Sequence, residues 1–118
     1  MSKMRDRIKA IQDTKSERVT MPEWENLEIE IRTMKAIDRA KLLKMAVDAE
    51  GKVIGDKFQA GMIIASCFDP ETGEKIFAND DADMIMEKSA GVIEFLAGRA
   101  MELSGLSRET MKTAEKNS

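Results

Sequence analysis

The sequence predicts a mainly α, α+β fold: a compact single-domain helical protein with one small β-hairpin. Apolar residues recur at helical spacing over much of the chain, whereas the clearest alternation of apolar and polar residues is at 27–32. A length of 118 residues suits one domain that buries its own core without a metal or a disulfide. We expect an N-terminal amphipathic helix and linker at 1–17, a globular α-rich domain at 18–114 and a polar tail at 115–118.

The first segment is basic and amphipathic. Its apolar residues have the i, i+4, i+7 spacing of one helix face and are Met4, Ile8 and Ile11. Residues 1–18 carry six basic and three acidic side chains, although the whole chain has a net charge of −3. The pattern predicts a short helix at about 3–12, followed by a polar linker at 12–17.

A β-hairpin is expected at about 18–33. Residues 19–22 have the pattern of a short edge strand, which Pro22 ends because proline cannot donate a ladder hydrogen bond. The second strand alternates charged residues with apolar ones, which are Leu27, Ile29 and Ile31. We expect the chain to turn at 23–26 and Trp24 to fold against that apolar face.

Two helices should follow the hairpin. Thr33 is the expected N-cap of the first helix, and Gly51 marks the place where it should stop. Its expected core stripe consists of Ala36, Ala40, Leu43 and Val47. Residues 58–68 are apolar nearly all round, which fits a buried helix or a central strand. Their length and their alanine and glycine content favour the helix.

A turn should separate this helix from the next one. Residues 69–73 place proline and glycine where a β-turn needs them. Residues 75–77 should then be extended, with Phe77 anchored in the core. Four polar residues suit a helix N-terminus: Asn79 or Asp80 as its cap, with Asp81 and Asp83 in its first turn.

The last part of the domain is also predicted to be helical. We expect a helix that runs to Ser104, either unbroken or with a break near Ser89. Gly105 is the expected C′ residue of this helix, followed by an apolar residue as in a Schellman motif. Ser107 should cap a short last helix before the tail.

Composition argues against an enzyme. The chain has no histidine, which removes Ser-His and Cys-His nucleophile pairs and imidazole metal ligands. Cys67, the one cysteine, lies in the most apolar segment and is interpreted as a buried structural thiol. The acidic spacing at 79–83 resembles a calcium loop, but Met84 and Ala90 stand where that loop needs glycine and glutamate. We therefore expect no catalytic residue, no cofactor and no metal.

Charge and hydropathy narrow the expected partners. A net charge of −3 argues against binding to nucleic acid or to anionic membranes. The longest mostly apolar run, at 60–68, is shorter than the roughly 17–25 residues that span a bilayer. The N-terminus has no apolar segment typical of a secretory signal. The sequence therefore predicts a cytoplasmic protein.

One apolar strip is a candidate partner-binding surface. If 82–103 forms one continuous helix, Met84 and Phe95 fall within its polar arc, with Gly91 and Gly98 beside them. An apolar strip with two glycines, bordered by charges, suits the docking of a partner helix. The alternative is that the helix breaks near Ser89, in which case these four residues do not form one strip.

An ordered series of segments runs from residue 19 to residue 118. It consists of VTMPEW at 19–24, an alternating strand that ends at 31–32, RAKLL at 39–43, FDPETGEKIF at 68–77, LSGL at 103–106 and KNS at 116–118. In this order the chain resembles the tail assembly chaperones of long-tailed, siphovirus-type bacteriophages. Glu25 follows Trp24 where the resemblance leads us to expect glycine.

The resemblance implies a non-enzymatic function in the cytoplasm of the host bacterium. Such chaperones bind the long, aggregation-prone tape measure protein and help tail tube proteins to polymerise around it, and self-association is also expected. The resemblance further implies a longer form made by a ribosomal frameshift. Residues 115–117 can be encoded by GAA-AAA-AAC, which permits such a slip, although a charged tail has an equally good explanation as solubilising sequence.

A structural phage component, such as a connector or adaptor subunit, is the alternative function. It would need one fixed and extensive interface, and purified phage particles would retain it. A nucleic-acid-linked regulator that uses the basic residues of the first helix is disfavoured by the acidic remainder of the chain.

Overall fold

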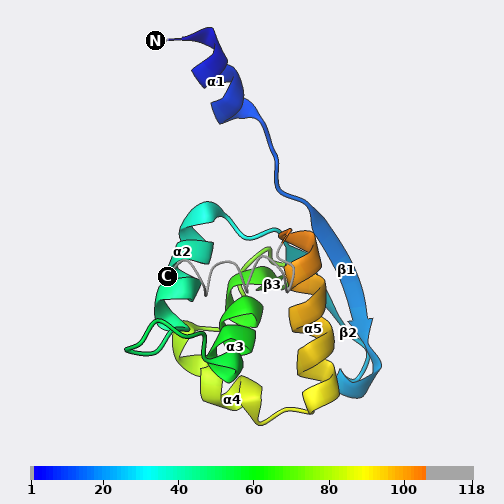
Figure 1. The fold of residues 1–118 in the computed structure, drawn as a ribbon. Helices are drawn as coiled ribbons and strands as arrows, with labels where there is room; N and C mark the ends of the chain where they lie inside the picture. The colour runs from blue at the N-terminus through cyan, green and yellow to red at the C-terminus, as the bar shows by residue number, and fades with distance from the viewer. Residues whose placement is uncertain (1, 106–118) are drawn as a thin grey trace.

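The computed structural model describes residues 2–105 and confirms the mainly helical α+β class (Figure 1). The helices of this part are α1 (Lys3–Ala10), α2 (Ala36–Met45), α3 (Gly55–Ser66), α4 (Ala82–Met86) and α5 (Ala90–Leu103). Its strands are β1 (Ser16–Met21), β2 (Leu27–Arg32) and β3 (Cys67–Phe68), and two 3₁₀ turns are η1 (Pro22–Trp24) and η2 (Asn79–Asp81). No helix within residues 2–105 is long and apolar enough to cross a membrane.

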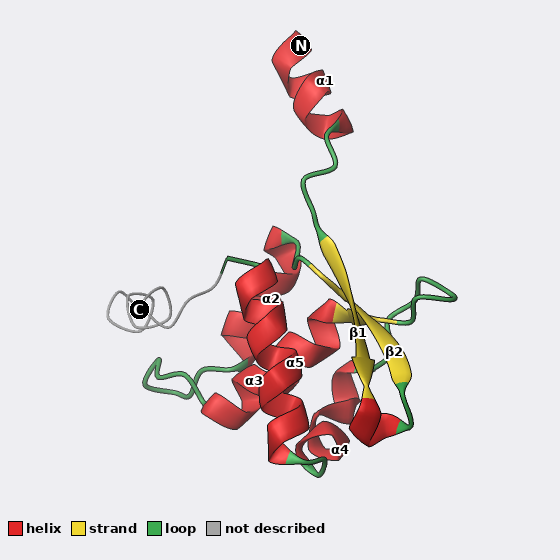
Figure 2. Ribbon diagram, turned by 90° about the vertical axis from the view of Figure 1, so that its right-hand side faces the viewer, coloured by secondary structure: helices red, strands yellow, loops and turns green. Residues whose placement is uncertain are grey.

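The strands form one antiparallel sheet in the order β1-β2-β3. The predicted hairpin is present, with Val19 opposite Ile29, and Figure 2 shows it on one side of the helices. Pairing begins earlier than expected, because the Thr33 N–H donates to the Lys15 carbonyl at 2.9 Å and the Lys15 N–H to the Thr33 hydroxyl at 2.9 Å. Thr33 therefore extends the pairing of the hairpin through its hydrogen bonds with Lys15. The prediction that it caps the next helix is wrong, since Lys35 occupies the N-cap position of α2.

The hairpin turn places two non-glycine residues in the left-handed region. Glu25 has φ 56° and Asn26 has φ 61°, and the Asn26 N–H donates to the Met21 carbonyl at 2.9 Å. Asparagine adopts this conformation readily, whereas other L-residues pay about 1–2 kcal/mol for it. The structure thus explains why glycine is expected at position 25. Trp24, at the end of η1, is half-buried against the core, as its position beside the apolar strand predicts.

The core lies between the inner face of the sheet and the helices. Ile29 and Ile31 of β2 are buried, whereas Leu27, expected on the same face, is 58% exposed because it lies at the outer end of the strand. α3 is the central helix and contacts α2, α4 and α5. Most of its residues are buried, which confirms the helical interpretation of 58–68 except for its last two residues, which form β3.

The predicted core stripe of α2 is wrong for its two alanines, whereas Leu43 is half-buried against the core and Val47, after the helix, is also half-buried. Ala36 and Ala40 are exposed, and the buried residues are instead Leu42 and, directly after the helix, Ala46. The helix turns this face inward because Leu42 packs against Gly61 of α3, where a β-carbon would lie 2.2 Å from the Leu42 Cδ1 atom. The helix ends at Met45, six residues before Gly51, which lies in a later loop with φ 83°.

The segment between β3 and α4 follows the predicted turn. Gly73 has φ 77°, and its N–H donates to the Asp69 carbonyl at 2.7 Å. Phe77 is half-buried against the core. Neither Asn79 nor Asp80 caps the following helix. Instead, Asp81 accepts a hydrogen bond from the Ala78 N–H at 2.8 Å, which fixes the start of η2.

The chain from 82 to 104 forms two helices, which confirms the predicted alternative with a break near Ser89. α4 ends at Met86, and Ser89 occupies the N-cap position of α5 with a non-helical backbone, φ −54° and ψ 132°. The break lets α4 and α5 both contact α3 while α5 also contacts β2. Gly105 has φ 71° after α5, which confirms its C′ role. The predicted last helix at Ser107 and the tail lie outside the described residues.

An ion pair joins α5 to the edge of the sheet. The Arg99 Nη2 atom lies 3.0 Å and 2.8 Å from the two carboxylate oxygens of Glu17 on β1, and its Nε atom adds a third hydrogen bond at 3.1 Å. These hydrogen bonds, together with the charge of Glu17, raise the pKa of Arg99 above its usual value. The contact holds α5 in a fixed orientation on the hairpin.

Cys67 is fully buried, which confirms its interpretation as a structural thiol. Burial raises the pKa of Cys67 to about 12. A thiol reagent such as DTNB should therefore leave the native protein unmodified at pH 8 and react with one thiol per chain in urea, because the thiolate is the nucleophile. Rapid modification of the native protein, measured by absorbance, would contradict this burial.

The raised pKa of Cys67 also predicts how the free energy of unfolding depends on pH. Above pH 9 the unfolded chain loses the Cys67 proton while the folded chain retains it, so the folded state binds more protons. The stabilisation that the protonated Cys67 thiol gives to the folded state is therefore complete below pH 9, and it is lost as the pH rises toward 12.

Candidate partner-binding surfaces

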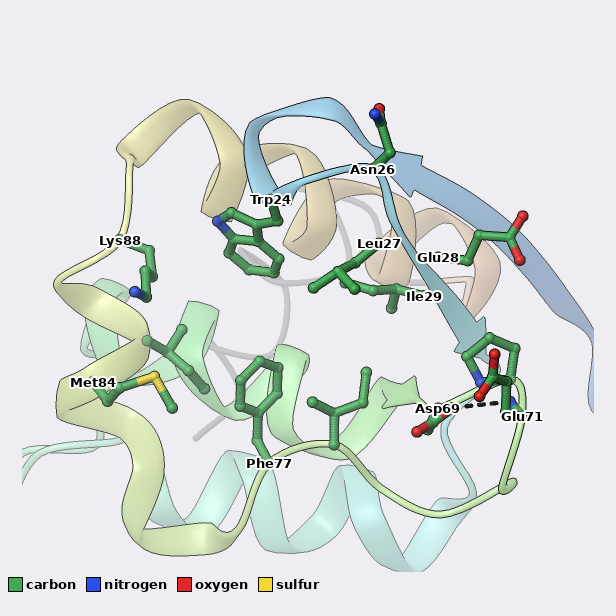
Figure 3. Close-up of a pocket in the computed structure, with 13 residues that line it drawn as sticks. Trp24, Asn26, Leu27, Glu28, Ile29, Asp69, Glu71, Phe77, Met84 and Lys88 are labelled. Atoms are coloured by element: carbon green, nitrogen blue, oxygen red, sulfur yellow. Dashed lines mark hydrogen bonds between the residues drawn. The ribbon is translucent and has the colours of Figure 1, made fainter.

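An open groove of about 660 Å³ lies between the hairpin turn, the loop that follows β3, and α4 (Figure 3). We call it the apolar groove. Its more buried side chains are Ile29, Phe77 and Ile85, and its edges are formed by Trp24, Leu27, Ile76 and Met84. Three of these edge residues are large and solvent-exposed: Leu27 at 58%, Ile76 at 40% and Met84 at 41%. Apolar surface of this kind, gathered in one concave place, is typical of a binding site.

The rim of the apolar groove is acidic. Asp69 and Glu71 lie along it, together with one cation, Lys88, whereas the Glu28 side chain points away from the groove on the outer face of β2 (Figure 3). Asp69 also orders its loop, because its side chain accepts a hydrogen bond from the Glu71 N–H at 2.8 Å. The acidic rim is therefore carried by a folded turn and favours a cationic partner.

A second exposed surface lies on α5. Gly91, Phe95 and Gly98 have the i, i+4, i+7 spacing of one helix side, and we call them the α5 face. Phe95 is 46% exposed and lies with Gly91 in a shallow pocket of about 300 Å³ beside Pro22. A β-carbon at Gly98 would meet no atom within 4 Å, and one at Gly91 would meet only the Ser89 hydroxyl at 4.0 Å.

The structure brings together three of the four predicted partner-binding residues. Gly91, Phe95 and Gly98 share the α5 face, whereas Met84 lies on the other side of the helix break and lines the apolar groove. The continuous helix on which the strip was drawn is therefore not formed. The hairpin turn borders both places, since Trp24 lines the groove and Pro22 lines the shallow pocket.

Sequence reasoning missed the apolar groove itself. The sequence pattern predicts that Leu27 lies on the buried face of the hairpin and that Ile76 belongs to an extended segment, and neither pattern indicates a groove. The groove combines residues from four separate segments, so no single periodicity reveals it. Within residues 2–105, no group of three or more potential acidic, cysteine or histidine ligands is placed to hold a metal ion.

Comparison with known proteins shows the family of this chain and a solved structure with a similar fold. A family model described as phage tail assembly chaperone matches residues 4–117. The solved structure of the bacteriophage HK97 tail assembly chaperone has a similar fold, with a TM-score of 0.58 at 16% sequence identity. The match covers 86% of this chain and 98% of the HK97 chain. No curated protein gives a significant match. The family match also includes α1, which lay outside the segments that carry the sequence resemblance.

Proposed function

The chain belongs to the phage tail assembly chaperone family, and we propose that it binds the tape measure protein of its phage through the α5 face. In the same proposal, the bound complex promotes polymerisation of tail tube proteins around the tape measure. In this proposal the chaperone acts by binding alone, without a catalytic step. A longer, frameshifted form of the chain is a further proposed participant. Residues 115–117, whose codons would permit the slip, lie outside the described residues.

The glycine at position 98 is the observation that supports the α5 face most directly. Gly98 lies inside a fourteen-residue helix, where glycine costs about 1 kcal/mol relative to alanine. Nothing within 4 Å of its missing β-carbon requires glycine. A partner whose backbone closely approaches this side of α5 would explain why position 98 is glycine, because glycine has no side chain to prevent such an approach.

Phe95 gives the α5 face an apolar anchor. It is exposed between the two glycines, one helical turn after Gly91 and about one turn before Gly98. Aromatic residues contribute a large share of binding energy at protein interfaces when a partner covers them. An amphipathic helix of a long helical partner, laid along α5, would bury Phe95 against its own apolar side. Met84 lies in the apolar groove and is not part of this contact.

Phe95→Asp should reduce co-purification of a co-expressed, tagged tape measure protein at least about tenfold, because the variant places a carboxylate at the anchor position. The fold should persist, since Phe95 is exposed and its neighbours Leu96 and Val92 hold α5 in the core. The measurement is a pull-down quantified against the chaperone, with circular dichroism as the check of folding.

Ile37→Asp is the matched control for this experiment. Ile37 is also an exposed apolar residue on a helix, with 60% of its surface accessible, but it lies on α2. Its replacement should leave tape measure binding unchanged. Equal binding by wild type and Phe95→Asp would refute the α5 face as the site. Loss of binding by both variants would show that the effect is not specific to this face.

Gly98→Ala should separate folding from binding. The substitution should raise the free energy of unfolding by up to about 1 kcal/mol, because alanine is the better helix former and its methyl group meets no neighbour. Binding to the tape measure protein should nevertheless weaken. Urea denaturation and the same pull-down measure the two effects. A variant that is more stable and binds equally well would contradict a close backbone approach at Gly98.

A further inference from the structure

The N-terminal helix α1 is an amphipathic element without a buried residue. The apolar side chains of α1 and of Ile11, at its C-cap position, are the most exposed of the large hydrophobic residues described, with Met4 at 70%, Ile8 at 63% and Ile11 at 61%. Figures 1 and 2 show α1 standing away from the helices and the sheet on a thin connection. A helix of eight residues is marginal by itself in water, so its apolar side needs a partner surface to be stable.

We propose that α1 of one copy docks into the apolar groove of a second copy, so that the chaperone self-associates through its N-terminus. Both surfaces present exposed apolar side chains. Met4, Ile8 and Ile11 form one narrow apolar stripe, and the groove offers exposed Leu27 and Met84 beside half-buried Trp24 (Figure 3). A helix that lays such a stripe into an apolar groove is a recurrent mode of recognition.

Charge complementarity points to α1 as the occupant of the groove. Four basic residues flank the apolar stripe of α1, with Asp6 as the single acidic residue: Lys3, Arg5, Arg7 and Lys9. The rim of the groove carries two carboxylates, of Asp69 and Glu71, and one lysine. Opposite charges around an apolar centre orient the two surfaces and favour this pair over a pair of identical surfaces. The association should therefore weaken as salt is added.

The direction of the chain favours a second copy over the groove of the same chain. Hydrogen bonds between Lys15 and Thr33 extend the hairpin pairing by one residue and direct the preceding segment away from the turn at Trp24. The four residues 11–14 that remain span at most about 14 Å. To reach its own groove, α1 would have to reverse within these residues and run back alongside β1. A neighbouring copy requires no such reversal.

Trp24 provides the signal for a direct test, because it is the one tryptophan and it lines the groove. Full-length protein is followed by sedimentation velocity and by tryptophan emission from about 1 to about 500 µM, a range that brackets a Kd near the micromolar scale. We expect the sedimentation coefficient to rise and the emission to shift to the blue together as concentration increases. Ile8→Asp should weaken this association at least about tenfold.

Ala10→Asp is the matched control, because it adds the same charge to α1 away from the apolar stripe. It should associate like the wild type. A wild type that stays monomeric over the whole range, or an Ile8→Asp variant that associates normally, overturns the proposal. An emission change caused by Ile8→Asp in a protein that is always monomeric would instead place α1 in its own groove and also overturn it.

Charge exchange tests the pairing of the two surfaces. The double variant Arg7→Glu/Lys9→Glu and the single variant Glu71→Lys should each associate more weakly than wild type. A chain that carries all three substitutions should recover association, because every copy then has an acidic α1 and a basic rim. Failure to recover, with native circular dichroism, overturns the assignment of α1 to this groove. None of these variants touches the α5 face, so tape measure binding can be measured independently.

Discussion

Leu96→Ala should lower the free energy of unfolding by about 2–5 kcal/mol, as expected when a fully buried leucine is truncated and a cavity remains. Leu96 has 0% exposure and lies on the inward side of α5, the helix that contacts both α3 and β2. The cavity left by the truncation should remain largely open, because α5 is held by its contacts with both α3 and β2. Urea denaturation followed by circular dichroism gives the difference in the midpoint and in the free energy.

Phe95→Ala is the matched control for this prediction. It removes a larger side chain from the adjacent position, but Phe95 is 46% exposed and has little packing to lose. Its cost should be about 1 kcal/mol or less, as for most surface substitutions. If Phe95→Ala were the more destabilising of the two, the orientation of α5 described above would be wrong and the α5 face would be part of the core.

The hairpin and the central helix could be predicted because local pattern and tertiary role agree in them. Strict alternation at 27–32 fits only a strand with one buried face, and β2 indeed buries Ile29 and Ile31. The apolar run at 58–68 is too long for a typical strand and is buried on all sides, so its helical state follows from its length. Gly105 could be assigned from its place after a periodic segment, and its φ of 71° agrees.

The orientation of α2 and the break before α5 depend on contacts that a single segment does not encode. Small and large apolar residues occur on two sides of α2, and the close approach to Gly61 decides which side is buried. Residues 87–89 contain neither glycine nor proline, so no local residue demands a break there. Packing of two short helices on α3 outweighs the local preference for one long helix.

The candidate binding surfaces also include one that the sequence indicates, the α5 face, and one that it does not, the apolar groove. The α5 face could be found from the sequence because its three residues share one helix and one spacing. Met84 could not be placed, since its neighbours in the apolar groove come from the hairpin and from the loop after β3. The exposed apolar stripe of α1 was visible in the sequence, but its significance depends on the acidic groove that only the folded chain assembles.

Gly61→Val should destabilise the fold by about 1–3 kcal/mol through overpacking between α2 and α3. Even a β-carbon at this position would lie 2.2 Å from the Leu42 Cδ1 atom and 3.1 Å from the Met45 Cε atom. Leu42 is 3% exposed and cannot move into solvent without vacating the core. Gly98→Val is the control, because it makes the same change on an exposed side of α5 with no atom within 4 Å, and its stability should remain close to that of the wild type.

A double-mutant cycle with Leu42→Ala identifies the clash as the cause of the Gly61→Val effect. Leu42→Ala alone should be strongly destabilising, because it leaves a cavity in the core. In that background the valine at position 61 has room, so its cost should fall by about 0.5–3 kcal/mol, which is the coupling energy of residues in direct contact. Denaturation curves of the four proteins measure this difference. An equal cost of Gly61→Val in both backgrounds would show that the close contact between α2 and α3 is not what requires glycine there.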